Sequence, residues 1–379
     1  MSKKSDDRKN VVIIGGGGYG TGLARDLSAK LDASKYNLVL ISARSYYIHL
    51  VAAVRFTVTS EGKLEDRALI PYDHLFINNN GTFVQGKVTA VEDFGKGRGG
   101  DVVLDNGEKV HYDALVLATG LTWGGALAFP DLDADVRSAL ADWRRKFAGA
   151  SEIVFVGGGA VGIETAGEVR DAFPNKKITI VHSDNQLLND AYPDKFRKAI
   201  TKKVLAKKIN LVLGDYVDTI PQEGSVGFTT RNGKAFPNAD LVVPTSGGRP
   251  NTSFFATLGS NVLNERGFVK VNNTLEVPNH QGVFAFGDII QWPEQKQLGK
   301  AAGQIATVSA NLQSFLNGQK PAKIYKSPPE MIIIPVGKTS GVAYFGILWG
   351  IVLGDWASNM IKGKDLFVSM YRKNMGYST

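Results

Sequence analysis

Residues 11–20, Val-Val-Ile-Ile-Gly-Gly-Gly-Gly-Tyr-Gly, join a run of β-branched residues to a glycine-rich turn. A helical pattern follows to about Lys30, and a second strand is expected from Leu38 to Ser42. In such a Gly-x-Gly-x-x-Gly turn the first glycine makes the bend. The second lets a pyrophosphate approach the backbone, and the third allows close helix–strand packing. The helix N-terminus then faces the phosphates. The stretch predicts a βαβ unit with a dinucleotide site at Gly15, Gly17 and Gly20.

The same pattern returns at residues 153–162, Ile-Val-Phe-Val-Gly-Gly-Gly-Ala-Val-Gly. A helix to about Phe173 and a strand from Ile178 to Ser183 are expected after it. One such motif is a weak signal, but two copies in the same strand–turn–helix context are strong. The sequence therefore predicts a second dinucleotide site at Gly157, Gly159 and Gly162.

Between and after these units, other segments complete the expected fold. Residues 81–104 have the pattern of an antiparallel meander, with Asn106-Gly107 as a turn. Strands are expected to end at Thr119-Gly120, at Thr245 and at Gly287-Asp288, and a short strand spans Met331 to Pro335. The predicted fold class is α/β, with two Rossmann-like dinucleotide-binding domains and a small C-terminal α+β domain.

Composition excludes several classes of protein. The 379 residues include no cysteine, which excludes a disulfide-stapled scaffold, a thiolate metal site and electron transfer through a protein disulfide. No metal site is expected. The net charge of +8 invites a nucleic-acid partner, but the densest basic cluster, Lys195 to Lys208, has the spacing of an amphipathic helix. A solvated helix face is favoured over a phosphate-binding patch, so no nucleic-acid partner is expected.

The first ten residues mix lysines with Asp6 and Asp7 and have no apolar core. This pattern fits neither a signal peptide nor a transit peptide, and Ser2 stands where N-myristoylation requires glycine. The expected location is cytoplasmic, with peripheral attachment to a membrane or lipid droplet as the alternative.

From about residue 9 to 325, these motifs resemble the FAD-dependent pyridine-nucleotide oxidoreductases. The resemblance implies a glutathione-reductase-like architecture in which the first turn binds FAD, the second binds NADH or NADPH, and Gly287-Asp288 returns to FAD. It implies FAD-domain parts at residues 1–124 and 255–325, an NAD(P)H domain at 125–254 and a C-terminal domain at 326–379. Further cofactor contacts are implied at Val84, Thr119, Gly120 and Thr245. Asp288 suits flavin ribityl hydroxyls as an acceptor, and its alternative role is a helix N-cap.

Neither expected ribose-binding position carries the usual acid. In the first site Ser42 stands there, with Arg44 two residues on, so Arg44 either covers the adenine or is solvated. In the second site the position is His182, followed by Ser183. No acid is present there to repel a 2′-phosphate, so the sequence does not select NADH over NADPH. The cofactor preference stays open, with NADH slightly favoured as the expectation.

A closer resemblance is to the ferroptosis-suppressor and apoptosis-inducing-factor-like reductases, which are related to type II NADH dehydrogenases. It is carried by residues 48–55, 180–183 and 364–369, and by Gly287-Asp288 followed by Lys296. It implies a membrane-associated reductase of ubiquinone-like or vitamin-K-like quinones.

Several ionisable residues are candidates for this chemistry. Lys296 beside a flavin would stabilise its anionic reduced form, and the alternative is a surface lysine. The resemblance implies that Glu164 lies near the nicotinamide, whereas a solvated helix pair with Glu168 is the other interpretation. His49 and Arg55 are expected to face the flavin, with an interior histidine as the alternative for His49.

In the C-terminal piece, Gly346, Gly350 and Gly354 recur every four residues, which on a helix gives one smooth face. Two interpretations stay open: a helix docked on the FAD domain, or contact of residues 341–373 with a lipid surface. A homodimer is a further expectation. Rival functions are a reductase of an iron–sulfur protein, a haem protein or monodehydroascorbate, a redox-linked DNA-binding or death-signalling protein, and a membrane-docked protein with vestigial nucleotide sites.

Overall fold

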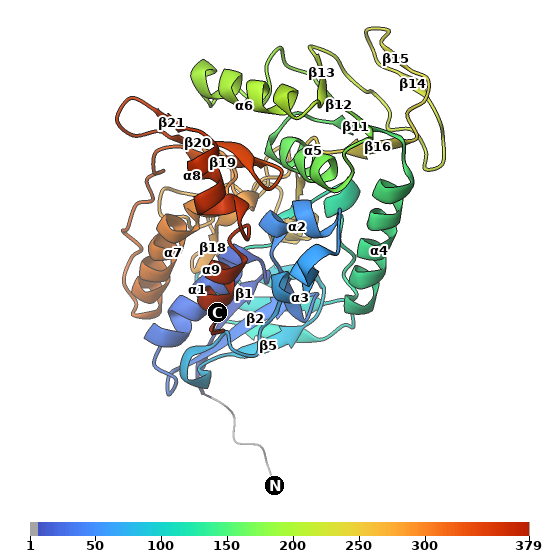
Figure 1. Ribbon diagram of the computed structural model, residues 1–379. Coiled ribbons are helices and arrows are strands. Elements are labelled where there is room, and N and C mark those ends of the chain that lie inside the picture. Colours follow the sequence, from blue (N-terminus) through green and yellow to red (C-terminus); the bar gives the residue numbers. More distant parts are fainter. Residues whose placement is uncertain (1–6, 379) are drawn as a thin grey trace.

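Two parallel sheets, each flanked by helices, form the body of the chain (Figure 1). The structure, a computed structural model, describes residues 7–378. Ser2 and the acidic Asp6 therefore lie outside the described residues, as do the expectations that depend on them.

The first sheet has the strand order β18-β9-β1-β2-β5, and all of its pairs are parallel. Helix α1 (Gly18–Lys30) joins β1 to β2, as the sequence predicts, and α7 (Ala301–Leu316) packs against α1. The strands are β1 (Lys9–Ile14), β2 (Tyr36–Ser42), β5 (Thr82–Gln85), β9 (Ala114–Leu117) and β18 (Val283–Ala285).

The second sheet has the order β13-β12-β11-β16 and is also parallel. Helix α5 (Ala160–Ala172) follows the second glycine turn, and α6 (Asp194–Ala206) is the expected amphipathic helix, with Phe196, Ile200 and Val204 fully buried. The strands are β11 (Glu152–Val156), β12 (Lys177–His182), β13 (Asn210–Leu213) and β16 (Leu241–Pro244), and α4 (Asp133–Gly149) precedes them.

The expected meander is confirmed with one change. Strands β6 (Val88–Asp93), β7 (Gly100–Leu104) and β8 (Lys109–Tyr112) form an antiparallel sheet, with the Asn106-Gly107 turn between β7 and β8. The segment before them, β5, instead extends the first parallel sheet.

Short elements complete the two domains. The chain runs from the first sheet to the second and later returns. The two connecting segments form a short antiparallel pair, β10 (Leu121–Thr122) with β17 (Arg249–Pro250). The expected domain boundaries remain a proposal. The other short elements are β3 (Tyr46–Ile48), α2 (Leu50–Phe56), α3 (Leu64–Ala68), β4 (Leu69–Pro71), β14 (Phe228–Thr229) and β15 (Ala235–Phe236).

The C-terminal piece is a three-stranded antiparallel sheet followed by short helices. Strands β19 (Met331–Val336), β20 (Ser340–Phe345) and β21 (Ile351–Leu353) lie against α5 and α6. The expected strand at Met331 is confirmed. The helix considered for Gly346 to Gly354 is wrong, because these residues span a hairpin turn and the short strand β21. After the sheet come α8 (Asp355–Ser358), a short π-helix (Asn359–Gly363) and α9 (Val368–Asn374). No helix among residues 7–378 is long and apolar enough to cross a membrane.

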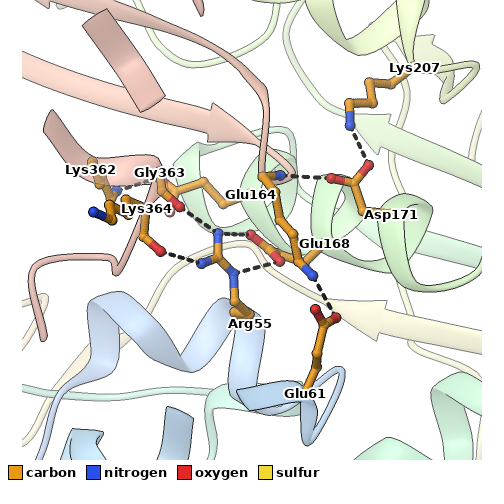
Figure 2. A network of polar contacts seen from close by, with 10 residues as sticks. Arg55, Glu61, Glu164, Glu168, Asp171, Lys207, Lys362, Gly363 and Lys364 are labelled. Carbon is orange, nitrogen blue, oxygen red and sulfur yellow. Dashed lines mark hydrogen bonds and ion pairs between the residues drawn. The ribbon is translucent and has the colours of Figure 1, made fainter. Parts of the chain in front are cut away.

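Buried ion pairs tie the C-terminal segment to both dinucleotide domains (Figure 2). Arg55 of α2 donates to both carboxylate oxygens of Glu168 on α5, at 2.8 and 2.9 Å, and to the carbonyls of Gly363 and Lys364. Lys362 pairs with Glu164, one helical turn before Glu168, at 2.7 Å. Burial raises the pKa of both glutamates, and the facing cations oppose that shift. The pairs therefore fix α2, α5 and the C-terminal segment relative to one another.

We expect Arg55→Met to lower the free energy of unfolding by about 3–5 kcal/mol, because Glu168 would stay buried without its guanidinium partner. Urea unfolding at neutral pH measures the change. The double variant Arg55→Met/Glu168→Met should recover most of it. Arg137→Met is the matched control: its pair with Asp66 is exposed, so its loss should cost less than about 1 kcal/mol. A cost for Arg55→Met as small as the control's would contradict this account.

Candidate active site

Both glycine turns bring the start of a helix into contact with the strand before it. An added Cβ on Gly20 would lie 1.9 Å from the carbonyl oxygen of Gly15, and one on Gly162 would lie 2.0 Å from that of Gly157. The space beside the middle glycines is open, because a Cβ on Gly17 or Gly159 would meet nothing within 4 Å. Neither helix N-terminus has a side-chain cap. Each turn thus leaves backbone N–H groups free for an anion, and the two turns fit pyrophosphate groups.

The strand end Gly287-Asp288 lies beside the first glycine turn. Gly287 has φ +81° and faces the ring of Tyr19 within that turn. Oδ1 of Asp288 is buried and accepts no hydrogen bond from the described residues. Burial raises the pKa of Asp288 to about 6, although Lys296 opposes the shift. An unpaired acceptor here fits a flavin ribityl hydroxyl. The N-cap alternative is wrong, since the turns at 287–289 and 298–300 and helix α7 have no side-chain cap.

Lys296 lies close enough to Asp288 to interact with its charge. Its Nζ donates to the carbonyl of Ile290 at 2.7 Å and lies over the ring of Phe268. Burial lowers the pKa of Lys296, and the charges of Asp288 and Glu294 oppose the change. Lys296 is therefore not the surface lysine of the alternative interpretation, and its contact with the flavin remains a proposal.

The second glycine turn is held by side chains from the strands beside it. Thr245 Oγ1 donates to the carbonyl of Gly157 at 2.9 Å. His182 accepts a hydrogen bond from the Gly158 N–H at Nδ1 and donates from Nε2 to the Leu188 carbonyl. A cavity opens between α5 and the end of β16, lined by Trp123, Gly124, Val161, Thr165, Pro244 and Thr245 among others.

Arg44 and Ser42 lie at the end of β2, next to the first glycine turn. Arg44 donates to the carbonyls of Phe129 and Pro130 at 2.7 and 2.8 Å, so it is not merely solvated. Ser42 Oγ lies 3.5 Å from the Tyr72 hydroxyl, which donates to the carbonyl of Gly16. Sequence reasoning missed Tyr72, because no motif connects it to that turn.

The other predicted contacts of the first site lie on neighbouring elements. Val84 is paired with Ile41, directly beside Ser42. Thr119 follows β9 and donates to the carbonyl of Asn251 at 2.6 Å, and Gly120 has φ +67°. The structure thus gathers these residues around the carboxyl ends of β1, β2 and β9.

His49 and Arg55, which are expected to face the flavin, both make hydrogen bonds within the chain, and their contact with the flavin remains a prediction. His49 is fully buried, accepts from the Tyr47 hydroxyl at Nδ1 and donates from Nε2 to the Leu366 carbonyl at 2.7 Å. Burial lowers the pKa of His49 to about 4, so the ring is neutral near pH 7. Both ring nitrogens are satisfied within the chain. His49 and Arg55 thus hold the C-terminal segment.

Glu164 lies on α5 between Val161 and Thr165, which line the cavity beside the second turn. The solvated-pair alternative is wrong, because Glu164 and Glu168 are both buried. The partner of Glu164 is Lys362, which sequence reasoning missed. A separation of 198 residues gives no local signal for such a contact.

Comparison with known proteins identifies the family. Residues 9–306 match the pyridine nucleotide-disulphide oxidoreductase family. The chain belongs to this family. It is accordingly an FAD-dependent pyridine nucleotide oxidoreductase that uses FAD and NADH or NADPH, and this confirms the predicted cofactors and the predicted resemblance.

Two relatives and one solved structure show how similar the chain is to proteins of known name or structure. The chain is 44% identical over 321 residues to FAD-dependent oxidoreductase FVFD30 of Flammulina velutipes, covering 85% of this chain and 99% of the relative. It is 30% identical to ferroptosis suppressor protein 1 of Taeniopygia guttata, covering 98% and 97%. The sulfide:quinone oxidoreductase of Aquifex aeolicus has the same fold, with a TM-score of 0.78 at 18% identity over 97% of this chain and 92% of that one.

We expect Asp288→Asn to lose FAD during purification. The substitution removes a charged acceptor, and a hydrogen bond to a charged group contributes about 1.5–3 kcal/mol, so binding should weaken roughly 10- to 100-fold. The ratio of flavin to protein absorbance after dialysis measures the loss. Glu265→Gln, an exposed acid on a nearby loop, is the control. Full retention of FAD by Asp288→Asn would exclude the ribityl contact.

Proposed function

We propose that this chain is an NAD(P)H:quinone oxidoreductase. The observation that carries the proposal is the pair of open glycine turns in a chain without cysteine. Electrons that reach the flavin cannot leave through a protein disulfide, so the acceptor must take them from the flavin itself. A diffusible quinone meets this requirement. Support comes from the solved sulfide:quinone oxidoreductase with the same fold and from the ferroptosis suppressor relatives.

The residues of this chain would bind and orient the reactants. FAD supplies the hydride-accepting ring when it is bound. The N-termini of α1 and α5 would hold the two pyrophosphates, and Asp288 would accept hydrogen bonds from the ribityl chain. Lys296 would place a positive charge where the reduced ring becomes anionic. Glu164, fixed by Lys362, would border the nicotinamide end of the second site.

Anaerobic mixing tests the proposal. NADH or NADPH should bleach the flavin absorbance of the purified protein. One equivalent of a short-chain ubiquinone or a menadione-type quinone should then reoxidise the flavin and restore the absorbance. Putidaredoxin-type iron–sulfur proteins, cytochrome c and monodehydroascorbate serve as competing acceptors. Faster reoxidation by one of these than by every quinone would overturn the assignment of the acceptor. A flavin that neither nucleotide bleaches would overturn the reductase itself.

We also propose that the β20–β21 hairpin contacts an anionic lipid surface. The hairpin projects from the body beside α6 (Figure 1). Trp349 is fully exposed and Leu348 is 72% exposed, and both have left-handed backbones, with φ of +63° and +48°. Such a turn usually carries Asn-Gly, so two large apolar residues there combine backbone strain with exposed apolar surface.

Nearby side chains extend this surface and supply the complementary charge. Trp356 and Met360 are also largely exposed. Helix α6 packs on β20 and carries the exposed Lys195 and Lys202. Aromatic residues beside lysines suit the boundary of an anionic bilayer.

We expect the double variant Leu348→Ser/Trp349→Ser to lose co-sedimentation with phosphatidylserine-containing vesicles at least tenfold, because it removes the apolar contact. Leu132→Ser/Val226→Ser, which alters exposed apolar residues elsewhere, is the matched control. The competing occupant is a second copy of this chain. A dimer in sedimentation velocity that the hairpin variant dissociates, with vesicle binding unchanged, would replace the lipid proposal by the expected homodimer.

A further inference from the structure

Equivalent hydrogen bonds to the neighbouring strand show which residues of the two glycine turns correspond. The Gly15 N–H donates to the carbonyl of Ile41, and the Gly157 N–H donates to that of Val181. His182 therefore occupies the position of Ser42, where this fold places the group that reads the ribose of the dinucleotide. Both ring nitrogens of His182 are already used by the Gly158 N–H and the Leu188 carbonyl. His182 thus holds the turn, and the ribose must be read by a neighbour.

Asp184 lies two residues beyond the end of β12 and is held by several hydrogen bonds. Its carbonyl accepts a hydrogen bond from Gly214, and its Oδ1 accepts one from the Asn185 N–H at 2.7 Å. Its Oδ2 accepts from Nη2 of Arg197 at 2.6 Å. The hydrogen bond from Arg197 holds the pKa of Asp184 below its usual range, so the carboxylate is charged at neutral pH. Its side chain is still 47% exposed and can meet a ligand.

Arg197 stands behind this carboxylate and is itself buried. Its side chain is only 7% exposed, and it also donates to the carbonyls of Leu187 and Gln186. A guanidinium here could bind a 2′-phosphate, but its Nη2 is already bonded to Asp184, the more exposed side chain of the pair. The arrangement neutralises the arginine and presents a carboxylate instead.

We infer that Asp184, positioned by Arg197, makes the second site selective for NADH over NADPH. The carboxylate would accept a hydrogen bond from the ribose 2′-hydroxyl of NADH and would repel the 2′-phosphate of NADPH. The inference rests on the proposed function in one respect, namely that a pyridine nucleotide is the hydride donor. It replaces the expectation from the sequence that, because His182 stands at the ribose-binding position, no acid selects NADH over NADPH.

Calorimetric titration of the FAD-loaded protein with ADP-ribose and with its 2′-phosphate tests the inference. These ligands lack nicotinamide, so the measurement does not depend on turnover. The unaltered protein should bind ADP-ribose at least tenfold more tightly than the 2′-phosphate. Asp184→Asn should reduce that ratio at least tenfold, since the repulsion is removed and Arg197 loses its counter-charge. Asp184→Glu should keep a preference for ADP-ribose.

Asp194→Asn is the matched control, because Asp194 is an exposed acid ten residues along the same loop and helix. The inference would be overturned if Asp184→Asn changed the ratio of the two affinities less than twofold. It would also be overturned if Asp194→Asn changed that ratio as much as Asp184→Asn does. Equal binding of both ligands by the unaltered protein would overturn it too. If neither ligand binds, the nucleotide site and the proposed function fall together. If the expected ratios appear but no quinone is reduced, only the proposed acceptor falls.

Discussion

The contact between the third glycine of each turn and the carbonyl oxygen of the first sets the geometry of both nucleotide sites. Any Cβ on Gly20 or Gly162 would overlap that oxygen, so each helix can begin directly on its strand only with glycine there. The close approach aims the uncapped N–H groups of α1 and α5 at open space beside Gly17 and Gly159. The strand-end residues at 119–120, 245 and 287–288 then become neighbours of a bound dinucleotide, because parallel strands end at one edge of a sheet.

The C-terminal segment adds a second constraint, which acts between domains. Buried ion pairs contribute little net stability compared with apolar packing, but removing one partner is costly, so they favour one arrangement strongly. Arg55 and Lys362 meet Glu168 and Glu164 on the helix that follows the second glycine turn. His49 adds a hydrogen bond to Leu366 in the same segment. The position of the second turn is thereby tied to α2 of the first domain, as direct transfer between two bound rings requires.

Much of the fold and part of the site follow from the sequence, because glycine turns, β-branched strands and strand-end acids obey local rules. The pairing of Glu164 with Lys362 does not, since it joins segments far apart in the chain with no periodic signal. The spacing of Gly346, Gly350 and Gly354 suggested a helix, but it arises from a hairpin whose turn holds Leu348 and Trp349 in left-handed conformations. Asp184 has no motif of its own, because the fold's ribose-binding position is the strand end, where His182 uses both ring nitrogens to hold the turn and Leu188.

The absence of cysteine gives the C-terminal piece its significance. The match to the pyridine nucleotide-disulphide oxidoreductase family covers both glycine turns and ends at residue 306. The antiparallel sheet β19–β21 and the segment after it lie beyond that match. Lys362 reaches Glu164 beside the second site, while the hairpin of the same piece exposes Trp349. If the proposed lipid contact and the proposed direct transfer from the flavin both hold, this piece would lie between the lipid surface and the second site. On that proposal the C-terminal sheet and segment would select the acceptor, while the glycine turns would hold FAD and the nucleotide that supplies the electrons.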